Sequence, residues 1–310
     1  MEFICYRFAA MGGQNEIQLY AQTAQEAQSA CLAGAAEVQR IEAKYSRYQP
    51  TSALSQINTG AGGRALPLDE ETSALLGYAD ACFQASEGLF DITSGILRKA
   101  WDFNAPASQA RVPSANALAP LLQHVGWQHV ERTTDQIKLP DGMELDFGGI
   151  GKEYAADRAS AVLSSLGIKN AMVNLSGDIR VLGPQPLPDG QDTVPWRIGI
   201  THPRHSASTL CTVAINCGAL ATSGDYERYL EIDGQRYCHI LNPRTGMPVQ
   251  HWHSVSVIAP LCVAAGSACT IAMLKGEAAI DFLKAQNISY LAVNPQTMLT
   301  SGLFATEINL

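Results

Sequence analysis

The stretch from Glu144 to Gly183 constrains the fold most, because it places a glycine-rich turn between regular elements. Met143–Phe147 predicts the end of a strand. Three glycines then interrupt it, and glycine tolerates left-handed or crowded backbone. From Lys152 onward, small and apolar residues recur at helical spacing. The stretch therefore predicts a strand, a tight turn and a helix in succession. The three glycines are Gly148, Gly149 and Gly151.

Two more strands are expected to follow this helix. Gly167 stands where a C-terminal cap would end it. Ala171–Leu175 predicts a second strand and Ile179–Leu182 a third. An acidic turn that contains Asp178 joins the two. One unit thus carries a glycine-rich turn at a helix start and an acidic turn further on.

The glycine-rich turn has two interpretations. Backbone N–H groups and the helix dipole favour an anion at a helix start, and Lys152 adds a point charge suited to a phosphate. The alternative is a purely structural turn in a domain of helices and strands. The spacing favours neither, because GGIGK satisfies neither of the two standard nucleotide-binding patterns.

The composition argues against two classes of function. The chain has 310 residues, 46% hydrophobic and 16% charged, which is ordinary for a globular protein with a substantial core. Its formal net charge is −8, and no basic run is longer than a pair. Binding to nucleic acid or to an anionic membrane therefore has no electrostatic support. No apolar run is expected to reach membrane-spanning length.

The eight cysteines indicate a reducing compartment. They form no C-x-x-C pair and no zinc-like spacing. Six lie among apolar or small neighbours, so buried thiols are expected, and such thiols persist most easily where disulfides are reduced. The N-terminus has no basic start followed by an apolar stretch. We therefore expect a cytoplasmic protein.

The remaining segments predict both packed helices and hairpins. Thr23 is expected to cap a helix that runs to about Tyr45, with Glu26 at the capping-box position. Asp233-Gly234, flanked by Tyr226–Ile232 and Arg236–Leu241, predicts a tight hairpin. Strands that occur both singly and in hairpins predict the α+β class, with mixed or antiparallel sheets and packed helices.

The domain organisation is expected to be simple. No repeat and no linker clearly divides the chain, so residues 1–310 are expected to form a single domain. Two segments rich in proline, 105–120 and 184–195, are expected to be surface excursions.

Six motifs, taken in order, closely resemble the ApbE family of flavin transferases (FAD:protein FMN transferases), from about Met11 to Leu303. They are SRYQPTSALSQIN, FDITSG followed by AWDF, LDFGGIGKEYAADR, NLSGDIR, ATSGDY and HILNPRTG. The resemblance implies an ApbE-like fold that binds FAD and attaches its FMN half, through a phosphoester, to a Ser or Thr of a target flavoprotein. AMP is released, and a divalent metal, usually magnesium, assists.

The resemblance also implies how the flavin is held. Met11 matches the methionine on one flavin face, and Tyr48 matches the aromatic residue on the other. Stacking of this kind is worth ~0.5–1.5 kcal/mol beyond area burial. The alternative for both side chains is ordinary core packing.

Further positions match FAD contacts and a catalytic group. His239 matches the residue that resembles a general base, a role suited to a pKa near neutrality. Lys152 would stabilise charge on the transferring phosphoryl group. The alternative for His239 is a histidine of the core. The positions that match FAD contacts are Asp102, Phe103, Asn104, Asp146, Lys152 and Ile240, although Gly-Phe-Gly is usual at the first three.

The metal site departs from the family pattern. Gly149 and Thr270 match metal-site positions, but Gly266 stands where the resemblance predicts a metal-binding Asp. Magnesium usually takes a carboxylate among its ligands, so Mg²⁺ affinity is expected to be low. Gly266→Asp is expected to raise it if the helix has room. A milder departure is Glu153 in place of the usual Gly.

Two alternatives to transfer remain at this stage. One is an FAD-binding protein that stores or delivers flavin without transfer, which Gly266 favours. The other is an FAD pyrophosphatase that releases FMN and AMP. His239, Lys152 and the intact HILNPRTG favour the transferase.

Overall fold

A computed structural model of the chain describes residues 1–188, 192–302 and 304. Its centre is an eight-stranded sheet in which every pair of neighbours is antiparallel. The order in space is β1 (Glu2–Ala10), β2 (Gly13–Ala21), β6 (Asn170–Leu175), β7 (Asp178–Val181), β12 (Gly218–Gly224), β15 (Ser254–Ala259), β16 (Ser289–Val293) and β17 (Met298–Ser301). The α+β class is confirmed, and the central sheet is antiparallel rather than mixed.

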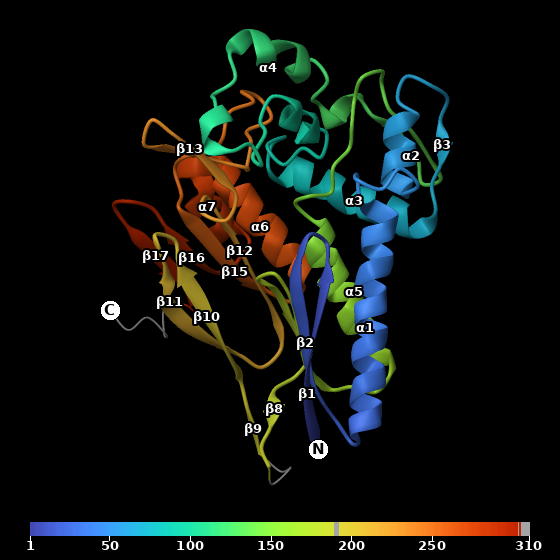
Figure 1. Cartoon of the computed structure of the whole chain (residues 1–310), viewed down its shortest axis with the longest axis vertical. Helices are drawn as coiled ribbons and strands as arrows, with labels where there is room; N and C mark the ends of the chain where they lie inside the picture. Colours follow the sequence, from blue (N-terminus) through green and yellow to red (C-terminus); the bar gives the residue numbers. More distant parts are fainter. Residues whose placement is uncertain (189–191, 303, 305–310) are drawn as a thin grey trace.

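Three long helices cover one face of this sheet (Figure 1). They are α1 (Ala24–Tyr45), α5 (Gly151–Ser165) and α6 (Cys262–Lys275). The helix α5 packs against both α1 and α6, so it is the middle one. Its position places the glycine-rich turn, which leads into it, between segments from distant parts of the sequence. The short helix α7 (Ala279–Ala285) packs beside α6.

The opposite face carries a hairpin of β10 (Trp196–His202) and β11 (His205–Ile215). Alternate residues of β10 point inward and are buried with side chains of the central sheet. The sheet is thus enclosed between a helical layer and a second β layer. Beside them lies the short strand pair β8 (Gln185–Pro186) and β9 (Thr193–Val194), within the expected excursion 184–195. Residues 189–191 of that excursion lie outside the described residues.

Residues 46–150 gather at one end of the helical layer (Figure 1). The elements there include α2 (Ala53–Thr59), α3 (Glu70–Ala85), α4 (Ala115–Leu122), the small sheet of β3 (Leu66–Pro67), β4 (Glu131–Arg132) and β5 (Gln136–Lys138), and the 3₁₀ turns η1 (Ser94–Lys99), η2 (Ala107–Gln109) and η3 (Trp127–His129). Within the expected excursion 105–120, Leu118 is buried against Trp101 and Leu230. Part of that segment therefore belongs to a small core.

The predicted N-cap of the first helix and the predicted hairpin turn are both confirmed. Thr23 is the N-cap of α1, and its side chain accepts a hydrogen bond from the Glu26 N–H at 3.1 Å. The hairpin of β13 (Tyr229–Ile232) and β14 (Gln235–Cys238) turns at Asp233-Gly234, where both residues have positive φ. Caps and tight turns depend on residues that are neighbours in the sequence, which is why the sequence alone predicts them.

The prediction of a strand at Met143–Phe147 is wrong. The side chains alternate between buried and half-buried, as in a strand. However, the backbone N–H and carbonyl of Leu145 bond to the side-chain amide of Asn58, at 2.7 and 2.9 Å. The Asp146 N–H donates to the Ile92 carbonyl at 2.8 Å. A distant side chain and a loop carbonyl thus take the place of a strand partner.

One segment is longer and more apolar than expected. Cys262–Ala285, which spans α6 and α7, reaches membrane-spanning length and composition, so the expectation that no run does so was wrong. In this fold α6 packs on β12 and β15, and most of its residues are buried. Gly276 has a φ of +57° between the two helices. These contacts are those of a core helix.

The cysteine prediction is confirmed for burial. Cys5 and Cys217 are exposed. The six buried cysteines are Cys31, Cys82, Cys211, Cys238, Cys262 and Cys269.

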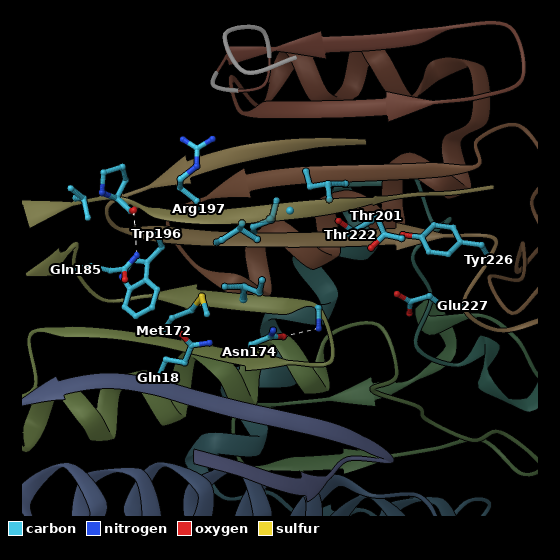
Figure 2. Close-up of a pocket in the computed structure, with 18 residues that line it drawn as sticks. Gln18, Met172, Asn174, Gln185, Trp196, Arg197, Thr201, Thr222, Tyr226 and Glu227 are labelled. Atoms are coloured by element: carbon cyan, nitrogen blue, oxygen red, sulfur yellow. Dashed lines mark hydrogen bonds between the residues drawn. The ribbon is translucent and has the colours of Figure 1, made fainter. Parts of the chain in front are cut away.

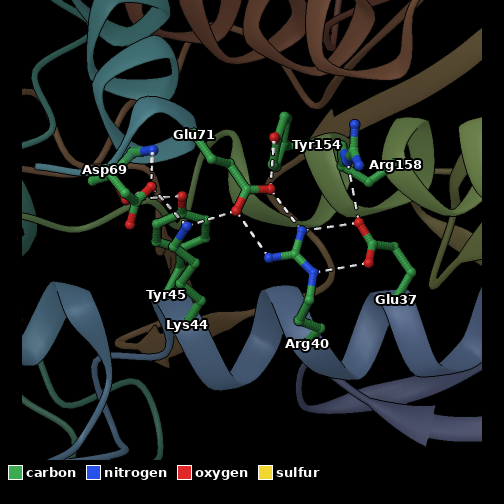
Figure 3. Close-up of polar contacts among 9 residues, drawn as sticks. Glu37, Arg40, Lys44, Tyr45, Asp69, Glu71, Tyr154 and Arg158 are labelled. Atoms are coloured by element: carbon green, nitrogen blue, oxygen red, sulfur yellow. Dashed lines mark hydrogen bonds and ion pairs between the residues drawn. The ribbon is translucent and has the colours of Figure 1, made fainter. Parts of the chain in front are cut away.

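Charged side chains tie α1, α3 and α5 together at the edge of the helical layer (Figure 3). The guanidinium of Arg40 contacts Glu71 at 2.6 Å and Glu37 at 2.8 Å. Lys44 contacts Glu71 at 2.7 Å, and the Tyr154 hydroxyl donates to the same carboxylate at 3.0 Å. We refer to this set as the α1–α3–α5 network. Its other members are Asp69 and Arg158.

Candidate active site

The glycine-rich turn is held by an ion pair that the sequence did not reveal. Arg47 donates to the carboxylate of Asp146. The second carboxylate oxygen accepts from the Gly148 N–H at 2.9 Å. Ile150, the N-cap residue of α5, supplies no side-chain hydrogen bond to the helix start. The turn is therefore fixed from outside, and the first turn of α5 is left without a side-chain cap.

Lys152, in that first turn, lies beside the acidic turn that ends β6. Its Nζ is 3.5 Å from Oδ2 of Asp178, which is buried. Burial acts to lower the pKa of Lys152, but the charges of Asp178, Glu153 and Glu227 outweigh it and leave the pKa raised. Lys152 therefore keeps its positive charge at the start of α5.

The pKa values of the two buried carboxyl groups nearby, Glu153 and Asp178, are also raised. Burial raises the pKa of Glu153 above its ordinary value, and the negative charge of Asp178 adds to this. Burial likewise raises the pKa of Asp178, while Lys152 opposes the shift and Glu227 adds to it. Such shifts are typical of functional sites, because a stability role alone rarely keeps two acids buried together.

His239 follows β14 and is oriented by a single backbone group. Its Nδ1 lies 3.1 Å from the carbonyl oxygen of Arg228. A carbonyl only accepts, so Nδ1 carries the proton and Nε2 holds the lone pair. Surrounding protein limits hydration of the ring and lowers its pKa below 6.5, and the charges of Arg228 and Lys152 add to the effect. His239 is neutral at pH 7 and can accept a proton.

The two predicted flavin contacts differ in exposure. Tyr48 is 79% exposed, so the core-packing alternative fails for it. The Arg47 guanidinium lies 5.5 Å from its ring centroid, which links Tyr48 to Asp146. Met11 has a φ of +53° in the turn between β1 and β2, and it packs partly against the core. Its Cε is 4.0 Å from the position that a Cβ on Gly151 would take.

The Trp101–Asn104 segment packs on the β13–β14 hairpin. The Trp101 indole stacks on Phe103 at 5.8 Å and lies 5.7 Å from the Tyr237 ring. Its Nε1 donates to the Gly246 carbonyl at 2.8 Å. Asp102 accepts from the Asn104 N–H at 3.0 Å. The segment is thus anchored next to the HILNPRTG motif, in which Ile240 is buried.

The predicted metal positions also come together. A Cβ on Gly149 would lie 3.9 Å from Cγ2 of Thr270, and the Thr270 hydroxyl is 3.2 Å from that of Ser223. Within the described ranges, no group of three or more His, Cys, Asp or Glu side chains could hold a metal ion. Magnesium that is bound partly by substrate phosphates needs only one or two carboxylates from the protein. Gly149, Thr270 and Ser223 provide none, so a magnesium site here would need one carboxylate from another residue.

A cavity of about 830 Å³ lies on the other face of the sheet, under β10 (Figure 2). None of the residues predicted for the site lines it. Tyr226 and Glu227 line one end, and the charge of Glu227 reaches Lys152 and Asp178. The cavity therefore ends near the start of α5.

The sequence analysis assigned no site role to four residues of this region, namely Arg47, Glu153, Asp178 and Glu227. Arg47 lies within the SRYQP motif and Asp178 within NLSGDIR. Nothing local indicated that Arg47 would pair with a residue 99 positions later. Contacts of this kind depend on the fold.

His239, Lys152 and the start of α5 indicate the class of protein. A neutral histidine, a lysine and an uncapped helix start are the groups that a transfer at phosphorus uses. The class is thus a group-transfer protein on an α+β scaffold. The sequence model of the ApbE family matches residues 11–292, and the chain belongs to that family.

Relatives and solved structures agree with this assignment. An FAD:protein FMN transferase from Vibrio cholerae is 32% identical over 245 residues, which cover 77% of this chain and 71% of the relative. One from Escherichia coli K12 is 27% identical over 260 residues, 81% of this chain and 72% of the relative. The crystal structure of the ApbE protein from Thermotoga maritima has a TM-score of 0.88 at 30% identity, covering 98% of this chain and 99% of that one. The flavin transferase ApbE from Vibrio cholerae has a TM-score of 0.85 at 27% identity, with 98% and 99% covered.

Proposed function

We propose that this protein is an FAD:protein FMN transferase. It binds FAD and attaches the FMN half to a Ser or Thr hydroxyl of an acceptor flavoprotein. The observation that carries the proposal is the state of His239, whose protonated Nδ1 is bound to the Arg228 carbonyl and whose Nε2 holds the lone pair. The pKa of the ring is lowered, so the base is ready near neutral pH.

The proposed reaction is a displacement at the phosphorus of the FMN half. The acceptor oxygen forms a bond to the phosphorus of the FMN half, and the bond from that phosphorus to the bridging oxygen breaks. AMP leaves with this oxygen, and the hydroxyl proton goes to Nε2 of His239. Lys152, whose pKa is raised by Asp178, supplies a fixed positive charge for the phosphoryl oxygens.

Flavin binding is proposed to use the exposed Tyr48 and the half-buried Met11. An aromatic ring that is 79% exposed has a face available for stacking. The loop at Asp102, Phe103 and Asn104, held by Trp101, and the buried Ile240 would contact other parts of FAD. Arg47 already neutralises Asp146, so this carboxylate would accept polar groups of FAD without adding a bare negative charge.

Magnesium is proposed as the metal. The backbone of Gly149 lies near the side chain of Thr270, and the Gly149 carbonyl and the Thr270 hydroxyl would supply neutral oxygen donors. When bound, the ion would neutralise phosphate charge and polarise the bond that breaks.

The test is incubation of the full chain with FAD and Mg²⁺, with and without a Ser/Thr acceptor protein. The expected result is acceptor that gains the mass of FMN, with one AMP per modified acceptor. Free FMN and AMP without acceptor would instead support the pyrophosphatase, and bound but unchanged FAD would support flavin storage. The names of the relatives favour transfer over both.

We propose that the acceptor is met in the cytoplasm. The support is chemical: Cys5 and Cys217 are exposed thiols, which persist best in a reducing compartment. Cell fractionation with antibodies to the protein would test this, and a fully membrane-bound or secreted pool would contradict it.

A further inference from the structure

The side chain of Glu153 fills the space that Gly266 leaves open on α6. A Cβ placed on Gly266 would lie 2.5 Å from Cγ and 2.5 Å from Oε1 of Glu153. No side chain could occupy both places. The two positions that depart from the family pattern, Glu153 and Gly266, are therefore one contact in the fold. The room that Gly266→Asp would need is already taken.

This carboxylate lies beside position 266, where the family pattern places the metal-binding Asp. Two pairs of residues bring the start of α5 and the helix α6 together. Gly149 lies near Thr270, and Glu153 lies against Gly266. Within each segment the two residues are four positions apart. Residues four apart on a helix share a face, so positions 266 and 270 form one strip of α6. The strip is bordered by the start of α5. The Ser223 hydroxyl, 3.2 Å from that of Thr270, adjoins it from β12.

The carboxylate is also incompletely bonded. Glu153 is only 7% exposed, and its Oε2 has no hydrogen-bond partner among the residues that the structure describes. The neighbouring cation, Lys152, is paired with Asp178 instead. Burying a carboxylate without a partner is costly, so buried carboxylates are normally paired or coordinate a metal. Glu153 thus supplies an unbonded oxygen beside position 266, one helical turn from Thr270.

We propose that Glu153 is the carboxylate ligand of a divalent cation at this site, together with Thr270. The charge that the family pattern places on α6 comes here from α5, and Gly266 is what allows it to reach the site. This inference rests on the proposed function in one respect: the ligand that does not come from the protein is taken to be the pyrophosphate of FAD. It concerns how this chain holds the metal, and its test does not require transfer.

The experiment is a titration of the full chain with Mn²⁺, followed by electron paramagnetic resonance of the unbound ion, with and without FAD. Mg²⁺ competition reports the magnesium affinity. Glu153→Gln keeps the shape and removes the charge, and it is expected to weaken Mn²⁺ binding in the presence of FAD roughly tenfold or more. Affinity for FAD without metal should not change.

Asp157→Asn is the matched control. It is one turn further along α5 and also faces α6, but its two oxygens accept from the Cys262 and Val263 N–H groups at 2.9 Å. It should leave Mn²⁺ affinity within about threefold of the parent, since those oxygens are already bonded. Melting curves for each variant confirm that the binding is measured on folded protein.

A charge exchange completes the test. The double variant Glu153→Gly with Gly266→Asp returns the carboxylate to α6 and should recover the Mn²⁺ affinity of the parent. Gly266→Asp alone should instead be destabilised, because the new side chain meets Glu153. Parent-like binding by Glu153→Gln would overturn the proposal, as would a folded double variant that fails to regain the metal. Normal metal binding without FMN transfer would instead count against the proposed function.

Discussion

Two groups of charged residues meet α5 from opposite sides, and they differ in how their charges are satisfied. In the α1–α3–α5 network, Glu71 contacts Arg40, Lys44 and Tyr154, and the pKa of Glu71 is lowered to about 2, first by its bond to Arg40. On the α6 side, burial raises the pKa of Glu153. One helix therefore carries a paired, partly exposed cluster and a buried, incompletely paired one.

The difference separates charges that hold the fold from charges that are available for chemistry. Carboxylates that gain partners on folding stabilise the native state. A carboxylate buried without partners costs free energy and persists where a ligand or a reaction uses it. Variants of the first cluster should change stability and spare transfer, whereas variants of the site should do the reverse.

The largest expected effect is on the chemical step. His239→Ala should reduce the rate of FMN transfer roughly 10²–10⁴-fold, because the general base is lost. FAD affinity and melting temperature should change little, since the residue keeps an exposed edge and its ring makes one hydrogen bond, to the Arg228 carbonyl, among the described residues. Single-turnover formation of modified acceptor, with FAD bound beforehand, measures this step.

The pH profile adds a second readout for His239. Because its pKa is lowered below 6.5, the neutral form persists into mildly acidic solution. The acid limb of kcat/KM should therefore have its midpoint below pH 6.5 and should vanish in His239→Ala. A variant that kept its rate but lost stability would identify His239 as a structural residue.

The second effect concerns flavin binding. Tyr48→Ala should weaken FAD binding by about 1–3 kcal/mol, through lost stacking and lost apolar contact. The unfolding free energy should stay nearly constant because the ring is 79% exposed. Fluorescence titration of FAD gives the affinity. Unchanged affinity would remove Tyr48 from the flavin site.

The third effect tests the network. Glu71→Gln should lower the free energy of unfolding at pH 7 by roughly 1–2 kcal/mol, because three partners lose a charged acceptor and Arg40 is partly exposed. Urea unfolding followed by circular dichroism measures it. Transfer by the folded variant should be unchanged, and a large loss of activity would break the contrast between the clusters.

The same variant has a defined pH dependence. The folded pKa of Glu71, about 2, lies below the ordinary value of 4.5, so its stabilisation is fully present above about pH 4.5. The contribution is lost as pH falls from there through about 2. The difference in unfolding free energy between parent and Glu71→Gln should therefore shrink over that interval. A constant difference would show that the Glu71 charge is not the cause.

The smallest effect is at the exposed end of the network. Arg158 contacts Glu37 at 3.1 Å, but its side chain is 43% exposed. Arg158→Ala should change the unfolding free energy by no more than about 0.5 kcal/mol, as is usual for exposed pairs. Glu37 keeps its bonds to Arg40 in that variant. A cost equal to that of Glu71→Gln would mean that the network acts as one unit.

The sequence by itself determined the elements whose signals are local. The Thr23 cap, the Asp233-Gly234 turn and the helix after Lys152 depend on neighbours a few residues away, and all three are present. The order of motifs likewise indicated the family, which the match over residues 11–292 shows. Residue types and their spacings are enough to predict such features, so no knowledge of tertiary contacts is needed.

The tertiary structure alone decided which distant residues share a space. The segment Met143–Phe147 reads as a strand but takes its hydrogen bonds from Asn58 and Ile92. Glu153 and Gly266 are separate departures in the sequence, yet they form one contact because α5 and α6 pack side by side. The physical reason is that hydrogen-bond partners and packing volume are shared between segments far apart in the chain, and only the folded backbone brings those segments together.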